Sequence, residues 1–316
     1  MPHRILGLHH VTATVDRAQA DIDFCVAALG LRLVKQTVNF DNHHVFHFYY
    51  GTETGHPGTI WTTFPYHGRN VGTGIKGAGQ VTATAFSVPE GSLDFWKQRL
   101  AGRAHLEETQ PRFGEQSIVV TDPSGLAIEL VATARDTREP WTGGGVEPDA
   151  AIRGLHSVSM VVNAPERTVE LMSDLLGLQK LDEAGRRIRM GTASAAPGQT
   201  VDVVHDPDAP RAANGLGTVH HVAFAIGSEE EQLALREELI DRNIDVTKVM
   251  DRQYFKSIYF REPGGVLFEV ATVAPGFTSD EPLPCLGQDL KLPPWEEPNR
   301  GIIEAGLPPI EIRGAR

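Results

Sequence analysis

The chain has 316 residues, of which 41% are hydrophobic and 22% charged, a composition typical of a globular protein with well-filled cores. Its formal net charge of −12 at pH 7 argues against a nucleic acid or an anionic membrane surface as the partner. No apolar run approaches the roughly 18 residues of a membrane span, and no signal peptide is evident. With two cysteines, Cys25 and Cys285, we expect reduced thiols and a cytoplasmic protein.

Two sequence patterns each occur twice along the chain. Residues 7–15 (GLHHVTATV) resemble residues 154–162 (GLHSVSMVV). Residues 122–133 (DPSGLAIELVAT) resemble residues 262–272 (EPGGVLFEVAT), and both carry a glutamate six residues after the proline. Each pattern has the alternation of a strand, and repeats of this kind indicate structural modules.

The repeats divide the chain into four units, each read as a strand, a helix and about three strands. They span residues 6–65, 79–133, 153–205 and 219–273. The predicted fold is therefore α+β, with four βαβββ modules. The turn-rich segment 134–152 marks the midpoint. We expect modules one and two in residues 1–140, modules three and four in 150–275, and a tail that wraps the surface in 276–316.

Alternation along the strands predicts which histidines face the open side of each sheet. His9 shares a face with apolar residues that should lie under the helix, so His10 should face the cleft. The same argument places His221 in the cleft and His220 on the apolar side. The third unit keeps the first histidine, His156, but has serine at the second position, which favours a structural role for the first member of each pair.

Glu269 falls on the cleft side of its strand by the same alternation, and Tyr259 falls on the polar side of the strand before it. A glutamate buried on a core strand is unfavourable unless it is paired or bound to a metal. Two neutral imidazoles and one carboxylate form the ligand set of non-haem iron(II) oxygenases, which leaves coordination positions open. His10, His221 and Glu269 are therefore the predicted metal ligands.

Other polar residues have a simpler interpretation. Aligning the repeats places Thr62 opposite Glu269, which favours three protein ligands over four because threonine is a poor ligand. Glu129 has no partner histidine, and we expect it to be ion-paired or hydrogen-bonded. Three histidines on an aromatic strand are expected to pack or to line the pocket: His43, His44 and His47.

These residues resemble the vicinal oxygen chelate superfamily, and within it the hydroquinone ring-cleaving dioxygenases typified by 2,6-dichlorohydroquinone 1,2-dioxygenase. The resemblance covers nearly the whole chain, from GLHHVT through GTVHHVAF and GVLFEVAT to the tail LKLPPWEEP. It implies iron(II), with manganese(II) as an alternative, held by His10, His221 and Glu269. It also implies substrate or supporting roles for five further residues: His9, Thr12, His220, Arg252 and Tyr259.

The superfamily also implies how the modules combine, because its metal cup forms between two paired modules. Ligands from the first and fourth units imply that these two pair, and that the second pairs with the third, giving two cupped mixed-sheet barrels. The expected reaction is ring opening of a hydroquinone or catechol with dioxygen, in a monomer or a homo-oligomer. Two other functions remain open: a glyoxalase-type isomerase or lyase, and a metal-free ligand-binding or resistance protein.

Overall fold

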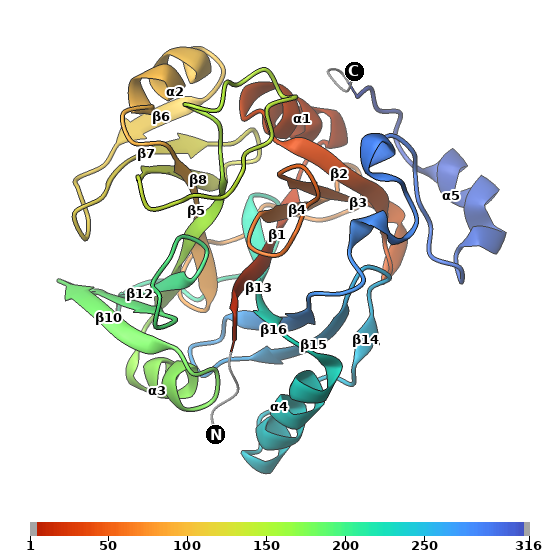
Figure 1. Cartoon of the computed structure of the whole chain (residues 1–316). Coiled ribbons are helices and arrows are strands. Elements are labelled where there is room, and N and C mark those ends of the chain that lie inside the picture. The colour runs from red at the N-terminus through yellow and green to blue at the C-terminus, as the bar shows by residue number, and fades with distance from the viewer. Residues whose placement is uncertain (1–4, 313–316) are drawn as a thin grey trace.

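Four modules follow one another along the chain in the computed structural model, which describes residues 5–312 (Figure 1). The first module comprises β1 (Gly7–Val15), α1 (Ala18–Ile22) with its π-helical continuation η1 (Asp23–Ala28), β2 (Arg32–Asn39), β3 (Asn42–Gly51) and β4 (Ile60–Pro65). The second comprises β5 (Gln80–Val88), α2 (Leu93–Leu100), β6 (His105–Glu108), β7 (Gln116–Thr121) and β8 (Ala127–Ala132).

The second half of the chain repeats this order. The third module comprises β9 (Gly154–Val162), α3 (Glu166–Asp174), β10 (Gln179–Ala184), β11 (Arg187–Gly191) and β12 (Thr200–His205). The fourth comprises β13 (Thr218–Ile226), α4 (Glu229–Asp241), β14 (Met250–Asp251), β15 (Lys256–Arg261) and β16 (Leu267–Thr272). The four βαβββ modules predicted from the sequence are confirmed.

The strands form two eight-stranded mixed sheets, each built from two modules. One sheet has the order β14-β15-β16-β13-β1-β4-β3-β2 and joins the first module to the fourth. The other has the order β10-β11-β12-β9-β5-β8-β7-β6 and joins the second to the third. At the centre of each sheet the first strands of the two modules run antiparallel: β1 lies beside β13 (Figure 1), and β5 lies beside β9. The predicted pairing of modules is therefore confirmed.

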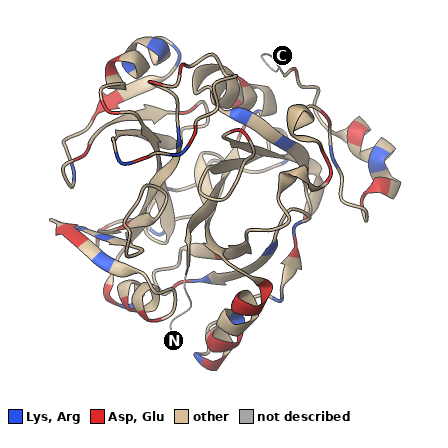
Figure 2. Cartoon of the chain, in the orientation of Figure 1, with Lys and Arg blue, Asp and Glu red and all other residues tan. Residues whose placement is uncertain are grey.

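Helices cover one side of each sheet and leave the other side open for a site. On β1, Val11, Ala13 and Val15 are fully buried in the main apolar cluster. Leu235 and Leu239 of α4 join the same cluster, and burying one such side chain contributes roughly 1.5–3 kcal/mol. Figure 2 shows that charged residues gather on outer elements such as α4 and α5 (Arg300–Gly306), whereas β1 and β13 carry none. No helix within residues 5–312 is long and apolar enough to cross a bilayer.

Bulges interrupt the pairing of the two central strands in each sheet. Between β1 and β13 the register steps by one residue around His9 and again around His220, so neither has a partner across the ladder. Between β5 and β9 the same steps occur around Thr82 and His156. A bulge locally breaks the alternation of side chains between faces. The prediction that His220 lies on the apolar side, away from the cleft, is therefore wrong, as described below.

The segment after β16 covers the outer edge of the sheet at β2. It contains three short 3₁₀ turns, Phe277–Ser279, Leu283–Cys285 and Glu297–Asn299, followed by α5. Leu290 pairs with Gln36 of β2. The neighbouring Lys35 is completely buried, and its ammonium contacts Glu281 and, at 2.6 Å, Asp280. The positive charge of Lys35 is thus neutralised by the C-terminal segment. Both cysteines are free thiols, as predicted.

Lys35→Met should destabilise the protein by about 3–5 kcal/mol, because it leaves the buried carboxylate of Glu281 without a cation. Denaturant unfolding followed by circular dichroism measures the change. The matched control is Lys180→Met, which removes an exposed pair with Glu183 and should change stability by no more than about 0.5 kcal/mol. Equal unfolding midpoints for the two variants would contradict the role given to Lys35.

Candidate metal centre and active site

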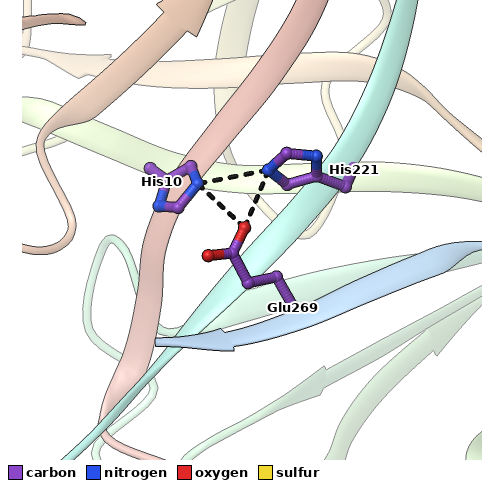
Figure 3. Close-up of side chains that lie close together, drawn as sticks. All are labelled: His10, His221 and Glu269. Atoms are coloured by element: carbon purple, nitrogen blue, oxygen red, sulfur yellow. Dashed lines mark hydrogen bonds and ion pairs between the residues drawn. The ribbon is translucent and has the colours of Figure 1, made fainter. Parts of the chain in front are cut away.

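Three buried side chains from three strands converge on one point (Figure 3). His10 comes from β1, His221 from β13 and Glu269 from β16. The two Nε2 atoms lie 3.2 Å apart, and Oε2 of Glu269 lies 3.2 Å from the first and 2.8 Å from the second. The predicted ligand atoms all lie within 4.8 Å of one another. These strands are neighbours because β1 pairs with β13 and β13 pairs with β16.

The bulged residue His9 determines which nitrogen of His10 carries a proton. His9 Nε2 lies 3.2 Å from the carbonyl oxygen of Thr272, which only accepts, so this nitrogen must donate. Burial, followed by the proximity of His10, lowers the pKa of His9 to about 3, so its ring is neutral and its Nδ1 accepts. His10 Nδ1, 2.9 Å away, must then donate. In neutral His10, the lone pair is on Nε2, which faces the centre.

His220 contacts His221 in the same way. Their Nδ1 atoms lie 2.7 Å apart, and burial, followed by the proximity of His221, lowers the pKa of His220 to about 3. Burial likewise lowers the pKa of His221. When His221 presents its Nε2 lone pair to the centre, its Nδ1 donates to His220 Nδ1, and His220 Nε2 then carries a proton. Each bulged histidine therefore orients the ligand that follows it.

Glu269 supplies a negative charge to the centre. Its Oε1 accepts a hydrogen bond from Ser257, whereas Oε2 is buried and has no donor among the described residues. Burial raises the pKa of this carboxyl, and positive charge at the point where His10 and His221 meet it is what lowers the pKa well below its usual range. A buried carboxylate oxygen without a donor is unfavourable. The oxygen therefore requires a positive charge at the point where the two imidazole nitrogens meet.

A divalent metal ion fits this donor set. Two neutral imidazole nitrogens and one carboxylate oxygen are suitable ligands, and together they leave coordination positions open. Thr62 occupies the position that matches Glu269, because it pairs with Thr12 of β1 as Glu269 pairs with Ala223 of β13. Its hydroxyl donates to Thr12 Oγ1 at 2.8 Å. Thr62 thus adds no carboxylate to the three predicted ligands.

The centre opens into a cavity of about 440 Å³. Aromatic side chains form much of its wall, including Tyr49, Phe64, Tyr66 and Phe255. Its size lies within the range of small-molecule sites, and apolar walls with few polar groups are typical of them. The cavity can therefore hold one small aromatic ring beside the cluster.

Tyr259 and Arg252 form the polar side of the cavity. Tyr259 pairs with Glu269 across the two strands, and burial, followed by the charge of Glu269, raises the pKa of its hydroxyl well above the usual range. Arg252 Nε donates to that hydroxyl at 3.0 Å, and its other end lies 3.1 Å from Asp41. Tyr259 stays a neutral phenol whose proton is available to a bound molecule.

The structure thus brings most of the predicted residues together but places some differently. Thr12 is buried beside Thr62 and His9 is buried behind His10, whereas His220 lines the cavity itself. The alternation argument failed for His220 because its bulge turns the side chain toward the cleft. Three contributors were missed: Ser257, Asp41 and Phe255. Ser257 could have been found, because it stands two residues before Tyr259 on the same face.

The second sheet contains an equivalent cup without the histidines. Its glutamate, Glu129, forms an ion pair with Arg112 and accepts a hydrogen bond from Ser117, which confirms the prediction for this residue. The positions that match the two ligand histidines hold Ser157 on β9 and Ala83 on β5. A guanidinium therefore supplies the positive charge here, and no metal cluster forms at these residues.

Known proteins resemble this chain over nearly its full length. Residues 154–270 match the Glyoxalase/Bleomycin resistance protein/Dioxygenase superfamily. MhqO of Bacillus subtilis (strain 168), named as a ring-cleaving dioxygenase, is 41% identical over 314 residues, covering 99% of both chains. The chlorohydroquinone/hydroquinone 1,2-dioxygenase of Sphingobium indicum is 38% identical over 307 residues, covering 94% of both chains.

Solved structures agree. A Bacillus subtilis crystal structure named as a dioxygenase superposes with a TM-score of 0.93 at 41% identity, covering 98% of this chain and 99% of that one. Maize glyoxalase I, at 15% identity and a TM-score of 0.62 over 85% of this chain and 92% of its own, shares the fold. With a metal-binding cluster at the meeting point of its first and fourth modules, the chain belongs to the ring-cleaving dioxygenases of the glyoxalase and dioxygenase superfamily.

Proposed function

We propose that the protein is an iron(II)-dependent dioxygenase that opens the ring of a hydroquinone with dioxygen, His10, His221 and Glu269 being the iron ligands. The observation that carries the proposal is the convergence of two imidazole Nε2 atoms on a buried carboxylate oxygen that has no hydrogen-bond partner among the described residues. Manganese(II) suits the same donors and is the alternative ion. Bound there, the ion would supply open positions for a phenolic oxygen and dioxygen and would relay electron density between them.

The hydroquinone substrate is supported by the Sphingobium indicum relative, whose name specifies chlorohydroquinone and hydroquinone. The aromatic wall formed by Phe64 and Phe255 suits a flat ring. A hydroquinone also carries two hydroxyl groups on opposite sides of its ring, and the cavity carries polar groups beyond the cluster. A catechol carries both hydroxyls on adjacent carbons and would not reach those groups in the same way.

The residues around the centre have separate roles in this proposal. Tyr259 donates its proton in a hydrogen bond to oxygen on the reacting ring, and Arg252 holds both the tyrosine and negative charge that develops there. His220, whose Nε2 carries a proton at the cavity wall, can pass that proton to the product. His9 contacts the ligand His10, and Thr12 accepts a hydrogen bond from Thr62. His9 and Thr12 are therefore positioning residues.

Alanine at position 10, 221 or 269 should abolish iron retention, because two remaining ligands hold the ion poorly. Metal analysis after anaerobic iron loading and desalting measures the loss. Iron should also raise the free energy of unfolding of the unaltered protein by about 2.7 kcal/mol at a hundredfold excess over Kd, and the three variants should lack that shift.

The control for this experiment is His156→Ala, which removes the equivalent bulged histidine from the other sheet. It should retain iron as the unaltered protein does. Equal loss of iron in all four variants, or full retention in the three ligand variants, would refute the ligand assignment.

Tyr259→Phe should keep iron bound but slow turnover by about a hundredfold or more, because it removes one proton donor and no ligand. Oxygen consumption with hydroquinone, combined with iron analysis of the same sample, separates the two effects. An unchanged rate would remove Tyr259 from the mechanism.

The same oxygen measurement tests the proposed function as a whole. The expected result is one dioxygen consumed per hydroquinone, with a ring-opened acid found by mass analysis. A glyoxalase-type isomerase would instead convert a glutathione hemithioacetal without consuming oxygen. The absence of a carboxylate at Thr62 is the observation against that second reaction.

A further inference from the structure

His47 of β3 is a wall residue of the cavity to which the preceding argument gives no role. Its imidazole is partly exposed, and its ring packs against Tyr49 at 4.0 Å and Phe64 at 4.3 Å between centroids. These two contacts restrict the orientation of the ring. The imidazole is therefore held in place at the cavity wall.

The hydrogen bonds of Thr62 determine the tautomer of His47. The Thr62 hydroxyl donates its single proton to Thr12 Oγ1 at 2.8 Å. His47 Nε2 lies 2.9 Å from the same hydroxyl oxygen and must therefore donate to it. Burial, followed by the proximity of His10 and His221, holds the pKa of His47 well below its usual range. The ring is thus neutral, and its Nδ1 presents a lone pair.

The place of His47 relative to the metal ligands follows from the pairing of strands. Thr62 occupies the position in the first module that matches Glu269 in the fourth, and His47, which contacts the Thr62 hydroxyl, lines the cavity wall. Three other polar side chains of the wall can donate: the Tyr259 hydroxyl, the Arg252 guanidinium and, when His221 binds the metal, the Nε2 proton of His220. The Asp41 carboxylate also lines the cavity, but it is already paired with Arg252. His47 is the imidazole that offers an acceptor.

We propose that His47 is a specificity-determining residue whose Nδ1 accepts a hydrogen bond from the ring hydroxyl that does not bind the metal. The inference rests on the proposed function, because it takes a hydroquinone held through its other oxygen as the ligand. A hydroxyl donates to this acceptor, whereas a methoxy group or a halogen at the same carbon cannot. A bound ring that covers this acceptor without donating to it is unfavourable, so the site would select rings with a free second hydroxyl.

The test compares anaerobic binding of hydroquinone and 4-methoxyphenol to the iron-loaded protein by calorimetry. Both ligands carry one phenolic oxygen for the metal, and they differ in the second oxygen. The unaltered protein should bind hydroquinone about tenfold more tightly than 4-methoxyphenol. In His47→Phe, which keeps an aromatic ring between Tyr49 and Phe64, the two affinities should differ by less than about twofold.

Two further variants separate recognition from folding. His47→Gln can donate to Thr62 through its amide nitrogen and accept through its oxygen, and it should restore most of the preference for hydroquinone. His43→Phe alters a histidine of the same strand that pairs with Glu296 and does not line the cavity, and its preference should equal that of the unaltered protein. If the role of His47 were purely structural, His47→Phe would weaken the binding of both phenols equally.

Each outcome is decisive. A preference that persists in His47→Phe overturns the assignment of His47 while leaving the proposed function intact, provided that hydroquinone still binds the iron-loaded protein and consumes oxygen. Failure of the unaltered protein to bind either phenol overturns the proposed function and this inference together. Loss of the preference in His47→Phe, with recovery in His47→Gln, supports the inference.

Discussion

Two imidazole nitrogens and one carboxylate oxygen face one another at the meeting point of three strands, and a metal ion there would draw an electron pair from each of the three. The tautomer of His10 follows from its outer nitrogen, since His9 must donate to a carbonyl and can then only accept from His10. Electron pairs this close repel each other unless a positive charge lies between them. The rest of the site depends on this requirement, because the same cation that relieves the repulsion also leaves room for exogenous ligands.

The bulges are what make this arrangement possible. In an uninterrupted strand His9 would point away from His10, and its ring could not reach the outer nitrogen of its neighbour. The register steps at His9 and His220 bring each ring within hydrogen-bond distance of the following one. A local irregularity in pairing, repeated on both central strands, therefore orients both ligand imidazoles.

Residues that follow the sequence repeats and the alternation of a strand could be predicted. Contacts between segments distant in the sequence could not. The ligands His10, His221 and Glu269 could be selected because repeats and alternation place them in matching positions. The orientation of His220 was mispredicted because a bulge is a property of two paired strands, and neither strand's own sequence records it. The ion pair between Asp41 and Arg252 joins the first module to the fourth, so it depends on the folded arrangement of loops.

The two sheets form two cups with the same arrangement of strands, so the residues of one cup can be compared with those of the other. In the second cup the glutamate remains at Glu129, the matching histidine positions hold Ser157 and Ala83, and Arg112 supplies the positive charge. A buried carboxylate at this position thus requires a cation in both cups. A guanidinium satisfies the carboxylate but offers no open coordination position. The two cups share the glutamate, and only the first adds imidazoles, which make it suitable for a metal. Chemistry at the centre depends on this replacement of a guanidinium by imidazoles.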